Sequence, residues 1–104
     1  MGCCCCGGEV QYDVSIAGTA RVNGVYVQNG TYEGRPMFVH KENGIQMWYN
    51  EGEWRIGKTR DYYYANKADD ENPPITGWIV ADSYCNADAS SPVPNITKKF
   101  CTCC

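Results

Sequence analysis

The clearest structural signal in this chain is MFVHKENGIQMWY, residues 37–49. Two runs of apolar, β-branched and aromatic residues flank Asn43-Gly44, a dipeptide in which both residues adopt positive φ at low cost. This pattern predicts a β-hairpin in which a two-residue turn joins strands over residues 37–41 and 45–49. Pro36 has no backbone N–H, so we expect it to begin the first of these strands.

Short strands separated by glycine-containing turns are predicted on both sides of this hairpin. Asn29-Gly30 is expected to close the strand before it, and alternation is expected to place Tyr62 and Tyr64 on one face of a later strand. Strands at intervals of roughly ten residues predict an all-β fold: an antiparallel meander of about seven short strands that forms a small barrel or a two-layer sandwich, with cysteine-rich tails. The predicted strands cover residues 11–16, 25–28, 37–41, 45–49, 53–57, 61–65 and 77–80.

The composition allows a single domain with an aromatic core. The chain has 104 residues, 43% of them hydrophobic, with eight Tyr and three Trp. We predict a β domain over residues 10–84, between a Cys/Gly-rich tail (1–9) and a Pro/Ser/Asn-rich tail with a cysteine cluster (85–104). The net charge of −3 provides no basic field for nucleic acid. No apolar run is long enough to span a membrane or to form the core of a secretory signal.

Seven of the eight cysteines lie close to the ends of the chain. A disulfide framework that stabilises a small secreted fold distributes its cysteines along the sequence, so an internal framework is not expected here. Cysteines at both ends are typical of points of attachment. These seven residues are Cys3, Cys4, Cys5, Cys6, Cys101, Cys103 and Cys104.

Lipid is the first attachment that the ends suggest. Removal of Met1 would expose Gly2, the acceptor for N-myristoylation, and stable membrane binding needs a second signal such as palmitoylated cysteines. The start resembles the Met-Gly-Cys-Cys openings of dually acylated peripheral membrane proteins, which implies acylation of Gly2 and Cys3–Cys6. Cys101 lies four from the end, as in a prenylation box, and Cys103-Cys104 resembles the ending of Rab-type small GTPases. The predicted lipidation residues are Gly2, Cys3, Cys4, Cys5, Cys6 and Cys101.

Two other attachments remain open. The seven terminal cysteines could cross-link neighbouring copies head to tail, which builds a filament and requires an oxidising, extracellular setting. Runs of cysteine also resemble those of metallothioneins, which bind soft metals. Consecutive cysteines lack the spacing of a structural zinc site, so we expect no metal site and no cofactor.

The central sequence resembles a short module that recurs in protist and other eukaryotic proteins. The resemblance implies a free-standing β module, to which it attaches no activity, ligand or catalytic residue. The residues that carry it are 22–26 (VNGVY), 34–39 (GRPMFV), 47–49 (MWY), 54–57 (WRIG), 62–66 (YYYAN) and 73–78 (PPITGW).

Three further groups of residues are candidates for a site. His40 and Cys85 could form a nucleophilic pair, but they lack a local signature, so catalysis is not expected. The run Asp69-Asp70-Glu71 could bind calcium, although it lacks the alternating ligands of an EF-hand loop. Arginines near tyrosines suggest a binding face for a sugar, peptide or phosphate. Its predicted residues are Arg35, Arg55, Tyr62 and Tyr64.

These observations predict a non-enzymatic interaction or structural module on the cytoplasmic face of a membrane. Its expected partners are the membrane surface and a protein or a second copy of the chain, without nucleic acid. The alternative is a filament-type subunit cross-linked through its terminal cysteines, assembled outside the cell. A carbohydrate- or peptide-binding module is the third hypothesis.

Overall fold

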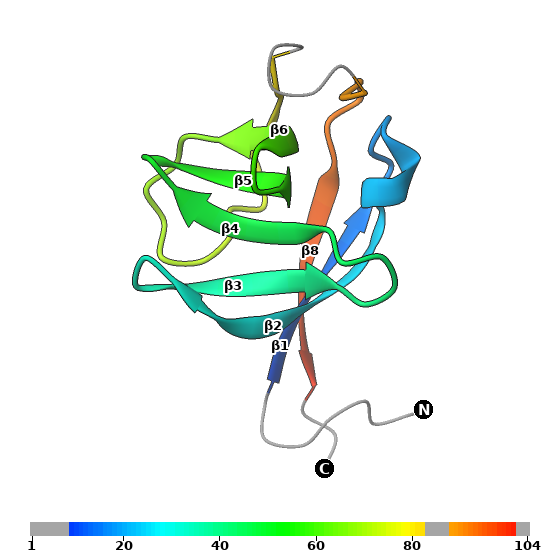
Figure 1. Ribbon diagram of the computed structural model, residues 1–104. Coiled ribbons are helices and arrows are strands. Elements are labelled where there is room, and N and C mark those ends of the chain that lie inside the picture. Colours follow the sequence, from blue (N-terminus) through cyan, green and yellow to red (C-terminus); the bar gives the residue numbers. More distant parts are fainter. Residues whose placement is uncertain (1–8, 83–87, 102–104) are drawn as a thin grey trace.

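A computed structural model describes residues 9–82 and 88–101 of the chain. One antiparallel sheet of eight strands curls into a half-barrel, and the described residues contain no α-helix (Figure 1). The all-β prediction is therefore confirmed. The strands are β1 (Glu9–Ser15), β2 (Gly24–Tyr32), β3 (Arg35–His40), β4 (Gln46–Asn50), β5 (Glu53–Lys58), β6 (Asp61–Asn66), β7 (Ile79–Val80) and β8 (Asn95–Cys101), and the short 3₁₀ helix η1 covers Ala20–Val22.

The first seven strands form the predicted meander, because each pairs with the next along the chain. The last strand departs from the prediction. Strand β8 pairs along its whole length with β1, from Ser15 opposite Asn95 to Glu9 opposite Cys101. The prediction that residues 85–104 form a tail is thus wrong for residues 95–101, and the sheet extends to Cys101. Ile96 anchors β8, since its side chain is only 4% exposed and belongs to the core.

The hairpin over residues 37–49 is present with a longer connection than predicted. Strands β3 and β4 pair with Val39 opposite Gln46, but residues 41–45 form a five-residue loop instead of a two-residue turn. His40 organises this loop: its Nδ1 accepts hydrogen bonds from the backbone N–H groups of Glu42 (3.0 Å) and Asn43 (3.3 Å). A side chain that accepts loop N–H groups stabilises the loop, because those donors would otherwise lack a partner.

The turn predicted at Asn29-Gly30 is also wrong. Strand β2 continues through a register shift between Gln28 and Thr31, and it ends at Tyr32, opposite Arg35. The two-residue turn therefore consists of Glu33 and Gly34. Gly30 takes its positive φ of +78° within this irregularity, because glycine suits a β-bulge as well as a turn.

A second irregularity, between β5 and β6, changes which tyrosines face the core. Ile56 lies opposite Tyr64 and Gly57 opposite Tyr62, so Tyr63 is an extra residue in β6. Gly57 has a φ of +154°, and a Cβ there would lie 2.4 Å from the Cα of Tyr62, so only glycine fits. As a result Tyr63 and Tyr64 both join the core, at 7% and 0% exposure. The predicted shared face of Tyr62 and Tyr64 is therefore wrong.

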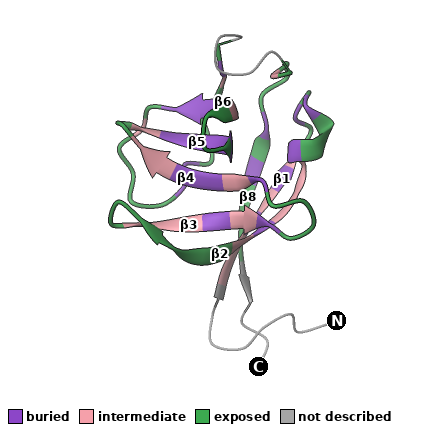
Figure 2. Ribbon diagram, in the orientation of Figure 1, coloured by how far each residue is buried: buried purple, intermediate pink, exposed green. Residues whose placement is uncertain are grey.

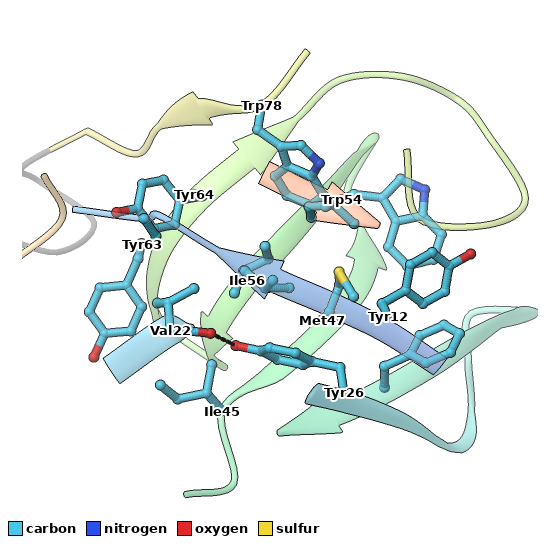
Figure 3. Close-up of a cluster of buried hydrophobic side chains, with 14 residues drawn as sticks. Tyr12, Val22, Tyr26, Ile45, Met47, Trp54, Ile56, Tyr63, Tyr64 and Trp78 are labelled. Carbon is cyan, nitrogen blue, oxygen red and sulfur yellow. Dashed lines mark hydrogen bonds between the residues drawn. The ribbon is translucent and has the colours of Figure 1, made fainter. Parts of the chain in front are cut away.

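The core lies on the concave side of the half-barrel and is largely aromatic (Figure 3). Its polar atoms find backbone partners: the Tyr26 hydroxyl donates to the Val22 carbonyl (2.6 Å), and the indole N–H of Trp78 donates to the Pro74 carbonyl (2.7 Å). Tyr12 packs edge-on against Phe38 with ring centroids 4.9 Å apart. Buried positions run along β4, β5 and β6, whereas the second half of β2 is exposed (Figure 2). Seven of the fourteen core residues are aromatic, and each such side chain buries about 150–250 Å², so they contribute strongly to the stability of this small domain.

The Tyr64 hydroxyl joins the two sides of the curled sheet. It accepts the N–H of Thr19 (2.9 Å), which lies after β1, and donates to the carbonyl of Ser90 (2.6 Å), which lies before β8. Thr19 adds two bonds to the same segment, from its hydroxyl to the Asp88 carbonyl (2.8 Å) and from the Ser90 N–H to its hydroxyl (3.1 Å). One hydroxyl on β6 thereby helps to hold the segment that leads into β8.

Candidate functional site

Of the predicted binding face, Arg55 and Tyr62 lie together. The Arg55 guanidinium stacks over the Tyr62 ring, 4.4 Å from its centroid, and it pairs with Glu53 (2.9 Å) and Glu51 (3.4 Å). Burial by itself lowers the pKa of Arg55, but Glu53, Tyr62 and Glu51 together outweigh it and the pKa is raised. With 9% of its surface exposed, Arg55 is held by partners within its own chain.

Arg35 has a similar environment on a different part of the sheet. Its guanidinium lies 3.6 Å from the centroid of the Tyr49 ring and contacts Asp69 (2.7 Å) and the carbonyl of Asp70 (2.8 Å). The hydrogen bonds from Arg35 and Tyr49 lower the pKa of the Asp69 carboxyl. The acidic run at residues 69–71, considered above for calcium, thus supplies partners to an arginine, and among the described residues no three metal-ligating side chains gather.

The four predicted residues do not share one surface. Tyr64 is fully buried in the core. Tyr49, the partner of Arg35, packs against the core side of the sheet, whereas Arg55 alternates with the core residues Trp54 and Ile56 and so faces the convex side. Arg55 and Tyr62 remain as the only part of that face that the structure brings together within the described chain.

A shallow groove of about 590 Å³ lies beside this arginine–tyrosine pair. Its lining includes Glu53, Tyr62, Lys67 and residues 79–82, among which Ile79 is 51% exposed. Its lining contains both acidic residues, Glu53 and Asp82, and the basic residue Lys67, so its charge does not favour one class of ligand.

The candidate nucleophilic pair of His40 and Cys85, which the sequence did not favour, is not tested by the described part of the chain. Cys85 lies outside the described residues. His40 is buried, and both its ring nitrogens are occupied, Nε2 by the Asn23 carbonyl (2.8 Å) and Nδ1 by the loop N–H groups. His40 therefore stabilises the loop of residues 41–45.

The remaining candidate is the end of the β1–β8 ladder formed by Glu9 and Cys101, which we call the attachment end. Directly opposite residues in an antiparallel pair have Cα atoms about 4.5–5.5 Å apart. The start of β1 (blue) and the end of β8 (red) lie side by side at the bottom of Figure 1. Of the predicted lipidation and cross-linking residues, Cys101 is the last residue of β8, and the following lie outside the described residues: Gly2, Cys3, Cys4, Cys5, Cys6, Cys103 and Cys104.

The ladder therefore determines where the cysteine-bearing segments begin. Two residues separate Cys6 from Glu9 and one separates Cys101 from Cys103, and one residue spans at most about 3.6 Å. Both segments start at one end of one ladder. Two lysines precede this end, Lys98 and Lys99, and Lys99 forms an ion pair of 3.4 Å with Asp13 on β1.

This convergence was missed at the level of sequence because it depends on β8. The one usable signal was the β-branched pair Ile96-Thr97, which follows Pro94 after a single residue, since proline is tolerated at the start of a strand. No family model matches this chain, and no curated protein or solved structure is detectably similar to it. Across residues 9–82 and 88–101, no helix has the length and hydropathy of a membrane span.

Proposed function

We propose that this protein is a non-enzymatic β module that attaches to a membrane surface through acyl groups on Gly2 and on the cysteines that follow it. In this role the half-barrel is the part that presents a surface to a protein partner. The segments that bear these residues join the sheet at the attachment end, and the domain lies on the cytoplasmic face of the membrane.

The observation that carries the proposal is the position of Glu9 opposite Cys101. A protein that binds a bilayer through two lipid-bearing segments must bring both to the same side of its folded domain. The β1–β8 ladder starts both segments there, without any requirement that the domain rearrange. A lipid on Cys101, as predicted from the prenylation-like ending, would be attached at this same end of the sheet.

The energetics require more than one signal. A single myristoyl chain gives a binding constant of only about 10⁴ M⁻¹, so palmitoylation of neighbouring cysteines is needed for stable attachment. Lysines close to an anionic surface contribute about 1 kcal/mol each. Lys99 already pairs with Asp13, so its contribution is reduced, and acyl groups supply most of the affinity.

The same observation weighs against the cross-linked filament. Head-to-tail linkage needs complementary groups on different sides of the subunit, so that each copy adds to the next. Here both cysteine-bearing segments begin at one end of one ladder. Cross-links there favour two copies joined end to end over a chain of copies joined head to tail.

The test is acylation in eukaryotic cells that express the full chain, followed with alkyne analogues of myristate and palmitate. We expect both labels on the wild-type chain, loss of Met1, a mass gain of about 210 Da for myristate, and recovery with membranes. Gly2→Ala should lose myristate and membrane binding, whereas the matched Gly8→Ala should retain both. Serine at Cys3–Cys6 should leave myristate in place and release the protein from membranes.

An unlabelled chain that keeps Met1 would contradict the proposal. So would membrane recovery of Gly2→Ala at the wild-type level.

A further inference from the structure

Three Asn-Gly dipeptides occur in this chain, beginning at Asn23, Asn29 and Asn43. Asparagine is a chemically labile residue. It is most reactive before glycine, because glycine has no Cβ to hinder attack of its backbone nitrogen on the preceding side-chain amide. This reaction needs an asparagine side chain that can move and open space around the glycine. The fold meets both conditions at Asn29.

The other two asparagine side chains are each held by two hydrogen bonds. The Asn23 amide accepts the N–H of Ala17 (2.9 Å) and donates to the carbonyl of the same residue (3.3 Å). The Asn43 amide accepts the N–H of Ile45 (3.0 Å) and donates to the carbonyl of Arg21 (2.8 Å). Both bonds must break before the Cγ atom of either side chain can approach the nitrogen of the next residue.

Asn29 lies at an irregularity in the exposed half of β2. The β2–β3 register shifts between Gln28 and Thr31, and the two residues between them have no partner in β3. On the other side, the pairing with β1 reaches only Val27. Asn29 is exposed, and within residues 9–82 and 88–101 its side chain has no hydrogen-bond partner. A Cβ added to Gly30 would have no atom within 4 Å, so a ring that forms there has room.

We propose that Asn29 is a site of spontaneous deamidation in the folded protein, and that the fold protects Asn23 and Asn43. The backbone nitrogen of Gly30 attacks the Cγ atom of Asn29 and gives up its proton. A C–N bond forms, and the side-chain nitrogen leaves as ammonia. Water then adds to one of the two carbonyls of the resulting succinimide and breaks its bond to nitrogen. One product is aspartate, and the other is isoaspartate, in which the main chain runs through the side-chain carbons.

The structure also indicates what the modification would change. Either product adds a negative charge to the exposed half of β2. Isoaspartate also lengthens the main chain by one carbon atom, at a position where β2 already departs from regular pairing. Beyond this position Tyr32 pairs with Arg35, whose guanidinium contacts Asp69 (2.7 Å). We expect isoaspartate to loosen this end of the β2–β3 hairpin and to leave the β1–β2 ladder intact. The modification is independent of the proposed acyl groups.

The experiment follows the unacylated full chain by peptide mapping during incubation at physiological temperature and mildly alkaline pH. Each Asn-Gly dipeptide is scored separately, from a mass gain of about 1 Da and from the chromatographic separation of aspartate and isoaspartate peptides. We expect Asn29 to react on the order of ten-fold faster than Asn23 or Asn43, because their hydrogen bonds must open first. In urea the three rates should agree within about three-fold, since unfolding removes the protection.

Two results would overturn the proposal. The first is a rate at Asn23 or Asn43 that equals or exceeds the rate at Asn29 in the folded chain. The second is the same ratio of rates in urea as in the folded chain, because the local sequence would then determine the ratio.

Asn29→Gln is the matched variant, since glutamine does not readily form the same ring and the side chain it replaces has no partner. This substitution should abolish the early acidic product and leave the rates at Asn23 and Asn43 unchanged. Formation of that product at the wild-type rate in Asn29→Gln would show that the assignment is wrong.

Discussion

Replacing Tyr64 by Phe removes a single hydroxyl that holds the two sides of the half-barrel together. That oxygen accepts the Thr19 N–H at 2.9 Å and donates to the Ser90 carbonyl at 2.6 Å, inside a side chain that is fully buried. A typical hydrogen bond contributes about 1 kcal/mol, and a buried donor left without a partner costs about 1–3 kcal/mol. Because Thr19 is only 5% exposed, we expect Tyr64→Phe to lower the free energy of unfolding by about 2–4 kcal/mol.

Urea unfolding of the reduced chain, followed by tryptophan fluorescence, measures this loss. For a domain of this size it corresponds to a decrease in Tm of roughly 10–20 °C. Tyr63→Phe is the matched control: the Tyr63 hydroxyl accepts one bond from Arg21 (2.9 Å), whose side chain is 53% exposed, so its loss should cost less than about 1 kcal/mol. A loss of less than about 0.5 kcal/mol for Tyr64→Phe, or equal losses for both variants, would refute the bridging role.

Three further predictions concern residues around the sheet. Gly24→Ala should destabilise the fold by about 2 kcal/mol or more, measured by urea unfolding, because a Cβ there would lie 2.3 Å from the His40 Nε2 at a φ of +147°; wild-type stability would contradict the packing. Asp69→Asn should lower Tm at neutral pH, and the difference from wild type should disappear as pH falls below the ordinary carboxyl value of 3.8. The sign follows from the lowered pKa, since the stabilisation is complete above the unfolded value and is lost as the folded carboxyl takes up a proton; a gap that persists in acid would exclude this origin. Ile96→Ala should cost about 2–4 kcal/mol, and hydrogen exchange should quicken in β8 more than in β4; uniform acceleration would show that β8 does not open separately.

Local signals in the sequence were sufficient for the meander. Residues 37–49 combine apolar runs with a polar connection, and each neighbouring strand pairs with the next, so short-range patterns carried the prediction. The turn lengths were wrong because His40 stabilises a five-residue loop through its side chain. Such a bond between a strand residue and a loop has no signature in local composition.

The candidate site was harder to predict because it depends on contacts between distant residues. Strand β8 contains two adjacent lysines, so its alternation is weak, and its partner β1 lies at the other end of the chain. Charged residues are common on edge strands, where they discourage pairing between molecules. Tyr64 was predicted to lie on a binding face at the surface. Because β6 contains the extra residue Tyr63, Tyr64 is instead buried in the core, where its hydroxyl contacts Thr19 and Ser90.

Interstrand NOEs between β1 and β8 in the unmodified chain show whether the two cysteine-bearing segments begin at one end of the sheet. We predict backbone NOEs along the whole ladder, from Ser15 and Asn95 to Glu9 and Cys101, with slowed amide exchange through residues 96–99. Absence of these NOEs, with random-coil shifts and unprotected amides over residues 95–101, would show that β8 does not pair with β1 and that this segment is a tail.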